Sequence, residues 1–117
     1  MRRFDLEQRV CGAITARRLI RFRLGSAKKA DLVIPLAVYL AANGRIMLAG
    51  LPVEDPKHPP EKGTPTDYEV ALFADLELTE HRFKAVAGFN SHTERFKAGV
   101  ECALDRKEDE AWPAETD

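Results

Sequence analysis

The chain has 117 residues, a net charge of −1, 44% hydrophobic residues and 32% charged residues, a composition typical of one globular domain. No apolar stretch approaches the roughly 20 residues that a membrane-spanning helix needs. No hydrophobic segment of a secretory signal follows Arg2-Arg3, so we expect a cytoplasmic protein that does not contact a membrane. Cys11 and Cys102 lack C-x-x-C spacing and are too few for a disulfide framework, so we predict two reduced, half-buried thiols.

The charge is unevenly distributed along the chain. Residues 1–29 contain nine Lys and Arg residues and two acidic residues, which gives a net charge of +7. Residues 30–117 contain nine Lys and Arg residues and seventeen acidic residues, which gives a net charge of −8. A basic edge could attract an anion or nucleic acid. Alternatively, the basic segment packs beside the acidic one, within the fold or across a homodimer.

The first part of the chain predicts a helix followed by two strands. Apolar residues every fourth position indicate an amphipathic helix over 5–17. Alternation with period two predicts a half-buried strand over 19–24, with Arg21 and Arg23 on its outer face. A second strand over 32–40 places Leu32, Ile34, Leu36, Val38 and Leu40 on one face. Because Pro35 cannot donate a hydrogen bond, this strand should lie at an edge or contain a bulge there.

Asn43-Gly44 predicts a tight hairpin. A type I′ turn needs positive φ at both central residues, which Asn-Gly favours. The turn leads into a third strand over 45–51. A proline-rich loop over 52–67 follows, with no apolar periodicity. Alternating residues then predict strands over 68–73 and 76–83.

The C-terminal part predicts a second helix and a tail. Ser91 and Glu94 have the spacing of a capping box, and an apolar stripe of Phe96, Val100, Ala103 and Leu104 follows. We therefore predict one domain over residues 1–104 and an acidic, flexible tail over 105–117, in which Trp112 could dock on a neighbour or a groove.

Five short strands with flanking helices predict an α+β fold that is mainly β. An open five-stranded sheet leaves bare edges, which closure removes. We therefore expect a small five-stranded SH3-like or Sm-like barrel with an N-terminal and a C-terminal helix.

A set of basic and aromatic residues is the strongest candidate for a binding site. Arginine suits a phosphate or carboxylate, and tyrosine supplies a hydroxyl or a stacking surface. The alternative is a charged sheet face, with arginines paired to Asp75, Glu77 or the acidic tail. The candidate ligand-binding residues are Arg21, Arg23, Tyr39, Arg45 and Tyr68.

The sequence offers little for catalysis. Asp75 and Glu77 share one strand face and could act as paired carboxylates, although a solvated face is the simpler interpretation. Neither cysteine has a nucleophile signature. His58, His81 and His92 lack the spacing of metal ligands, so we expect no metal, no cofactor and no enzyme activity.

The order of these parts resembles the WYL domain, a bacterial module with an Sm-like barrel. The similarity spans residues 5–83, and Ile46 and Met47 stand where the family has Trp and Tyr. The matching segments are Ala13-Ile14, Leu19-Ile20-Arg21-Phe22-Arg23, Val33-Ile34-Pro35, Gly44-Arg45-Ile46-Met47-Leu48 and, more distantly, Leu72-Phe73-Ala74-Asp75-Leu76-Glu77.

The resemblance implies a function in binding or sensing rather than catalysis. Members of this family are thought to bind ligands or nucleic acid, and they usually carry a DNA-binding winged helix. About 18 residues precede the first predicted strand, too few for a winged helix. We expect a regulatory module that binds an anionic ligand, either a nucleotide or a short nucleic acid. The alternative is a protein–protein interaction or self-assembly module without a small ligand.

Overall fold

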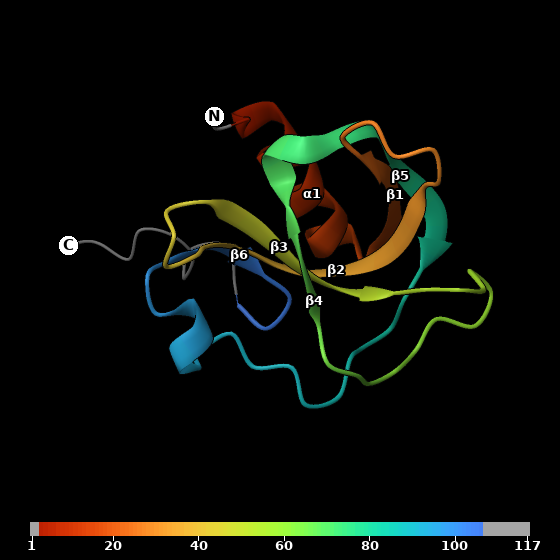
Figure 1. The fold of residues 1–117 in the computed structure, drawn as a ribbon. Coiled ribbons are helices and arrows are strands. Elements are labelled where there is room, and N and C mark those ends of the chain that lie inside the picture. Colours follow the sequence, from red (N-terminus) through yellow and green to blue (C-terminus); the bar gives the residue numbers. More distant parts are fainter. Residues whose placement is uncertain (1–2, 107–117) are drawn as a thin grey trace.

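The computed structural model describes residues 3–106. These residues form one α-helix, two 3-10 turns and six strands, which confirms a fold that is α+β and mainly β (Figure 1). The elements are α1 Phe4–Ala16, β1 Arg18–Leu24, β2 Asp31–Leu40, β3 Ile46–Pro52, β4 Thr66–Glu69, η1 Val70–Leu72, β5 Phe73–Arg82, η2 Glu94–Phe96 and β6 Val100–Ala103.

The six strands form one antiparallel sheet around β2. The strand order is β4-β3-β2-β1-β5, and β6 also pairs with β2. β1 pairs with the first part of β2, where Ile20 lies opposite Val33. β6 pairs with the last part, where Cys102 lies opposite Val38. Since β3 pairs along the other side of β2, both edges of this strand are occupied.

The sheet is curled. β4 and β5 are the two ends of the strand order, yet only η1 separates them in the chain. A flat sheet would put these strands roughly 19 Å apart at the usual strand spacing, too far for a three-residue connection. The sheet must therefore curve until the end of β4 approaches the start of β5, as the upper part of Figure 1 shows. Among the described residues, β4 and β5 form no strand pair with each other, so the sheet is not closed by hydrogen bonds.

The central strand β2 is buried on both faces. Residues 33–39 are all buried, a run that differs from the predicted alternation. The register with β3 shifts between Pro35 and Ala37, which confirms the predicted bulge at Pro35. Because a bulge inserts one extra residue, the side chains after it point to the opposite faces of the sheet from those that the alternation before it would predict. Ile34 and Leu36 lie in one apolar cluster, whereas Val38 packs with Val33 in another, so the prediction of a single shared face is wrong.

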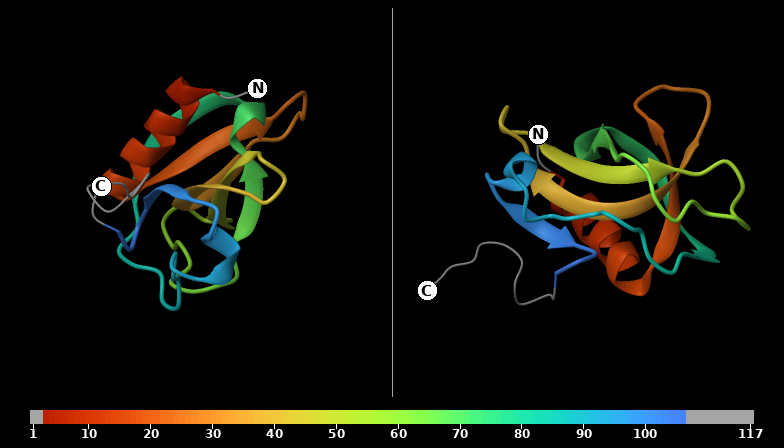
Figure 2. Two further views of the ribbon diagram at one scale, coloured as in Figure 1. Left: turned by 90° about the vertical axis from the view of Figure 1, so that its left-hand side faces the viewer. Right: turned by 90° about the horizontal axis from the view of Figure 1, so that it is seen from below.

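Helix α1 covers one side of the curled sheet (Figure 2, left). Its apolar stripe consists of Leu6, Val10, Ala13 and Ile14, all buried in the cluster that also contains Phe22 of β1. The helix ends at Arg17, which is in the left-handed conformation with φ 57°. Its backbone N–H donates to the carbonyls of Ala13 and Ile14 and closes the last turn.

The predicted C-terminal helix is wrong. The segment from Ser91 contains only the short turn η2 and then strand β6. Ser91 is buried, and its N–H donates to the carboxylate of Asp105 at 2.9 Å. Sheet pairing of β6 with β2 thus prevails over the local helical pattern. Residues 107–117, and with them Trp112 and most of the predicted tail, lie outside the described residues.

The predicted hairpin forms, but with a different turn. Leu40 and Ile46 pair across a loop in which the N–H of Gly44 donates to the carbonyl of Ala41. Gly44 has φ +85°, whereas Asn43 does not have positive φ. The type I′ prediction is therefore wrong, and the longer loop places one glycine in the left-handed region. The Asn43 side chain accepts a hydrogen bond from the N–H of Arg45.

Gly50 of β3 allows the backbone of β2 to approach closely at the bulge. A Cβ on Gly50 would lie 2.4 Å from Cγ1 of Val33 and 3.0 Å from the carbonyl oxygen of Ile34. We expect Gly50→Ala to lower the free energy of unfolding by about 1–3 kcal/mol, because the extra methyl group overpacks the core. Urea denaturation followed by circular dichroism measures this change.

Gly12 is the matched control for Gly50. No atom lies within 4 Å of a Cβ built on this helical residue. Gly12→Ala should therefore raise the free energy of unfolding by about 0.5–1 kcal/mol through helix propensity. Equal effects of the two substitutions would contradict the close approach at Gly50.

Candidate functional site

The basic residues of β1 are paired with carboxylates of the neighbouring strand β5. Arg21 lies opposite Glu77 in the register, and its Nη1 is 3.3 Å from Oε1 of that residue. Arg23 donates from Nε and Nη2 to Oδ2 of Asp75 at 2.8 and 2.5 Å, and from Nη1 to the carbonyl of Ala27. All three nitrogens of the Arg23 guanidinium thus have partners within the fold. Part of the +7 charge of the N-terminal segment is neutralised in this way.

Asp75 occupies an unusual backbone position. It has φ 54°, a left-handed conformation that aspartate tolerates better than most residues. The register between β1 and β5 shifts between Arg21 and Arg23, which marks a local irregularity. The two carboxylates that could have acted as a catalytic pair, Asp75 and Glu77, are therefore each held by a different arginine.

Arg45 lies at the opposite end of β2 from Arg21. Arg21 pairs with Leu32 and Arg45 precedes Ile46, which pairs with Leu40. Eight residues of strand correspond to roughly 25 Å. Nη1 of Arg45 is 2.9 Å from Oε1 of Glu69, in a small depression of about 180 Å³ that Arg3 and the buried Glu7 also line. The structure does not bring Arg45 together with Arg21 and Arg23.

Tyr39 and Tyr68 are packed in the interior. The Tyr39 ring meets Phe96 edge-on at 4.7 Å between centroids, beneath the guanidinium of Arg95. Burial, with a hydrogen bond to Asp67, raises the pKa of Tyr39. The Tyr68 ring meets Phe22 edge-on at 5.3 Å, and burial raises the pKa of its hydroxyl as well. Both rings therefore serve as core aromatics, 3% and 8% exposed, rather than as stacking surfaces for a ligand.

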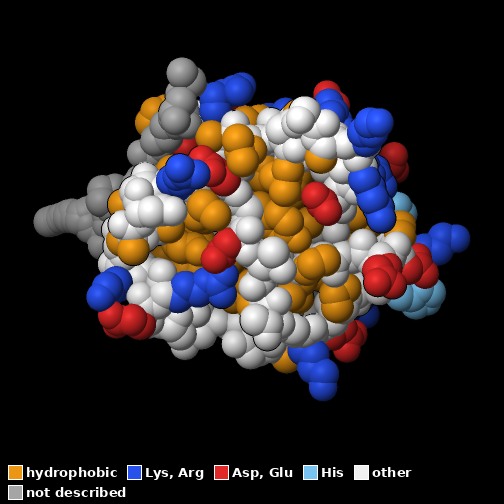
Figure 3. Space-filling model, viewed as in Figure 1, with side chains coloured by type: hydrophobic (Ala, Val, Ile, Leu, Met, Phe, Trp, Pro, Cys, Tyr) orange, Lys and Arg blue, Asp and Glu red, His pale blue; other side chains and the backbone are white. Residues whose placement is uncertain are grey.

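The basic groups on the face shown in Figure 3 do not form one patch. Lys and Arg side chains are scattered there, mostly near the margin, among acidic ones. Of the residues predicted to bind a ligand, only Arg21 and Arg23 are neighbours on the same strand face. A ligand held by the whole set is not supported by this arrangement.

The structure contains a larger groove between α1 and β6 that the sequence did not indicate. It has a volume of about 710 Å³, within the range typical of small-molecule sites. We call it the α1–β6 groove. Its lining residues from α1 and its C-terminal end are Gln8, Cys11, Gly12, Ile14, Thr15 and Arg17, and those from β6 and the residues after it are Glu101, Cys102, Ala103, Leu104 and Arg106.

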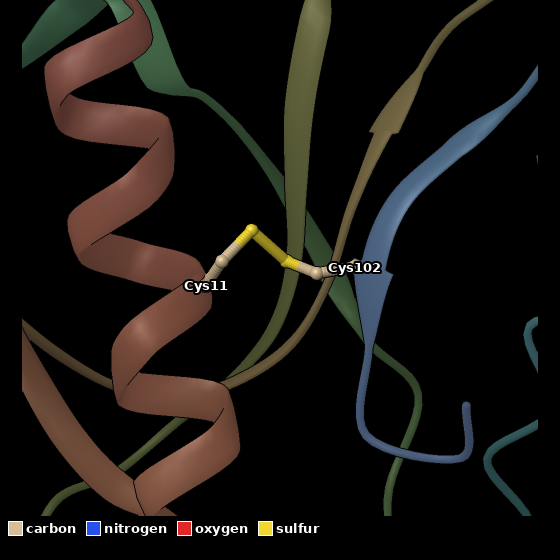
Figure 4. Close-up of a disulfide and its surroundings, with 2 residues drawn as sticks. All are labelled: Cys11 and Cys102. Atoms are coloured by element: carbon tan, nitrogen blue, oxygen red, sulfur yellow. A yellow bond between two sulfur atoms is a disulfide. The ribbon is translucent and has the colours of Figure 1, made fainter. Parts of the chain in front are cut away.

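A disulfide bond joins the two walls of the groove. Cys11 of α1 and Cys102 of β6 are bonded, with 5.8 Å between their Cα atoms (Figure 4). The prediction of two reduced thiols is therefore wrong. The two residues are 91 positions apart in the chain, so no local pattern could indicate the bond. Both are half-buried, as predicted.

Two arginines line the groove and have neutral hydrogen-bond partners. Arg17 donates from Nη1 to the backbone carbonyl of Lys84. Arg106 donates to the hydroxyl and the carbonyl of Ser91, at 2.7 and 2.8 Å, and its Nη2 also lies 3.3 Å from Nδ1 of His92. Because the oxygen acceptors are uncharged, they orient the guanidinium groups without cancelling their charge. Glu101 is the acidic residue in the lining.

The described residues contain neither a candidate metal site nor a helix that could cross a membrane. Across residues 3–106, no three His, Cys, Asp or Glu side chains are grouped so that they could hold a metal ion. His58 lies instead within hydrogen-bond distance of Asp55, at 3.0 Å. No helix in this part of the chain is long and apolar enough to cross a membrane.

Comparison with known proteins does not assign a family. No protein-family model matches the chain, and a search of curated proteins found no match. The resemblance to the WYL domain therefore remains a hypothesis, and the site must be judged by its geometry.

The disulfide should contribute strongly to stability. In the chain-entropy account, closing a loop of about 90 residues restricts the unfolded chain by about 4–5 kcal/mol, and native bonds are worth about 2–5 kcal/mol in practice. We expect the double variant Cys11→Ala, Cys102→Ala to lose about this much unfolding free energy in urea denaturation. Dithiothreitol should destabilise the parent protein by a similar amount.

The double variant is also the control for the reductant. Dithiothreitol should leave its urea midpoint unchanged, because it contains no disulfide. A parent protein that has the same midpoint with and without complete reduction, verified by alkylation, would contradict this role of the bond.

Proposed function

We propose that the protein is a non-enzymatic module that binds a small anionic ligand in the α1–β6 groove. The observation that carries this proposal is the pair of groove-lining arginines, Arg17 and Arg106, which have no carboxylate among their hydrogen-bond partners within residues 3–106. Guanidinium groups favour phosphate and carboxylate, with which they form charge-assisted hydrogen bonds. The paired arginines of β1 would instead have to exchange a carboxylate partner for the ligand.

The lining suggests the character of the ligand. Ile14, Ala103 and Leu104 provide apolar surface, and Gln8 and Thr15 provide polar groups on the helix side. A compact ligand with an anionic group and a less polar body matches this combination. A nucleotide or a carboxylate metabolite fits this description better than a long nucleic acid, which needs an extended basic surface.

The resemblance to the WYL domain supports a binding role, and we propose that the curled sheet is a small SH3-like or Sm-like barrel. The support is the short η1 connection between β4 and β5, together with the bulge at Pro35. Ile46, at the position of the family's Trp, is buried against β2, and Met47 is half-buried. These side chains serve the core, consistent with a ligand site elsewhere in this chain. A cytoplasmic, regulatory role is part of the same proposal.

NMR titration of the ¹⁵N-labelled protein tests the location. Inorganic phosphate, citrate, a mononucleotide and a short oligonucleotide serve as probes, at low salt. We expect at least one small anion to shift the amides of Gln8, Gly12 and Glu101 and to saturate. The double variant Arg17→Asn, Arg106→Gln should weaken that binding by about tenfold or more, since a hydrogen bond to a charged group contributes about 1.5–3 kcal/mol.

Matched variants separate the groove from the predicted arginine set. Asparagine suits the left-handed conformation of residue 17, and Arg106→Lys keeps the charge and should retain most of the affinity. Arg21→Gln should bind like the parent. Shifts that cluster around Arg21 and Arg23 instead, with binding lost in Arg21→Gln, would contradict the groove assignment.

Self-assembly is the second candidate function. Phe4 and Leu72 are large hydrophobic residues that are 59% and 48% exposed, and they lie on α1 and η1, which contact each other. Exposed apolar surface of this kind often marks a contact with another protein.

Light scattering tests the second candidate. If Phe4 and Leu72 form a contact between copies, the parent protein should have the mass of a dimer at high concentration. The double variant Phe4→Ser, Leu72→Lys should be a monomer, because it removes apolar contact area and adds charge. A parent protein that is monomeric at every concentration would exclude this interface.

A further inference from the structure

We propose that the α1–β6 groove is a site of thiol–disulfide exchange, at which a small thiol carrying a carboxylate opens the Cys11–Cys102 bond. This inference rests on the proposed anion-binding function of the groove and names a chemical class of ligand for it. It assigns a reaction to a bond that would otherwise have only a structural role.

The disulfide is placed where a small molecule can reach it. Both cysteines line the groove and both are half-buried rather than enclosed in the core. Figure 4 shows the bond joining the side of α1 to the strand β6. A thiol that enters the groove therefore meets the bond between its two walls.

The reaction needs no oxidant other than the disulfide. The thiolate of the small molecule attacks one sulfur, forms a mixed disulfide with that cysteine and releases the other cysteine as a thiolate. A second small thiol then attacks the mixed disulfide. The protein gains two thiols, the bond is reduced by two electrons, and the two small thiols leave as their disulfide.

The groove arginines favour an anionic thiol. Arg17 and Arg106 line the same groove as the bond, and among residues 3–106 their partners are carbonyl and hydroxyl oxygens and, for Arg106, also Nδ1 of His92. Their charges attract a carboxylate and also stabilise the cysteine thiolate that leaves. A neutral thiol gains only the second effect, and a cationic thiol is repelled on approach.

Opening the bond should loosen β6 more than α1. The helix is held by its own buried stripe of Leu6, Val10, Ala13 and Ile14. β6 is a strand of four residues, Val100–Ala103, whose pairing with β2 shifts in register between Val38 and Tyr39 and is flanked by one backbone hydrogen bond on each side, at Gly99 and Leu104. Reduction therefore removes the covalent support of the shorter element, which forms one wall of the groove.

Rates of exchange with three small thiols test the proposal. Mercaptoacetate is anionic, 2-mercaptoethanol is neutral and cysteamine is cationic. Each reaction is quenched with acid, the free cysteines are alkylated, and the number of alkylated cysteines is measured by mass spectrometry. Each rate is then divided by the rate at which the same thiol reduces a small uncharged disulfide. We expect the normalised rate of mercaptoacetate to exceed that of cysteamine by about fivefold or more, because partly exposed charge pairs contribute up to about 1 kcal/mol each.

Variants and salt identify the source of this preference. The double variant Arg17→Asn, Arg106→Gln should reduce the ratio of the normalised mercaptoacetate rate to the normalised cysteamine rate to about one. Arg106→Lys should keep this ratio, and Arg21→Gln should leave it unchanged. Raising the salt from about 10 mM to about 1 M shortens the Debye length from about 30 to about 3 Å and should also reduce the ratio in the parent protein. Because the salt series uses the parent protein, its result does not depend on whether a variant folds.

The outcomes separate this inference from the proposed function. A ratio near one in the parent protein, or a ratio that neither salt nor the double variant changes, overturns the exchange site. If phosphate or citrate still binds the groove by NMR in that case, anion binding stands alone. A charge-dependent ratio without binding of any non-thiol anion supports the exchange site and overturns the broader binding function.

Discussion

The structure depends on the burial of strand β2 on all sides. β1 and β6 pair with successive parts of one edge, β3 pairs with the other edge, and residues 33–39 are covered on both faces. This burial requires that residues 33–39 carry no charge and that the neighbouring strand has no side chain at the point of closest approach. Pro35 and the bulge provide the change of face, and Gly50 provides the space. Helix α1 packs on β2 and β1, whereas β5 pairs with β1 and β4 pairs with β3.

Charge alone is a poor guide to a binding site in this fold. Arg21 and Arg23 are conspicuous in the sequence because they alternate with apolar residues, yet their distant partners Glu77 and Asp75 hold them in the structure. Arg17 and Arg106 are inconspicuous, one at a helix end and the other beyond the last strand. What distinguishes the second pair is the neutral chemistry of the oxygens that hold them, which only the folded structure reveals.

Local periodicity predicted the helix and the first three strands, because the apolar face of each is formed within one short segment. It failed where a distant partner decides the structure. Ser91 and Glu94 resemble a capping box, but Ser91 is held by Asp105 and Arg106, and Val100 to Ala103 pair with β2. The alternation of β2 was predicted without the reversal at its bulge. For the candidate site, the lining residues come from the two ends of the chain, so neither the groove nor the bond between Cys11 and Cys102 has a local signal.

The position of that bond has a mechanical consequence. Two Cα atoms that are 91 residues apart in the chain are held 5.8 Å apart by a covalent bond. Tension applied to the chain on either side of this loop passes through the bond between residues 11 and 102. The bond therefore prevents the segment between these residues from being pulled out to its full length. In the reduced molecule the same segment would lengthen by unravelling strand by strand.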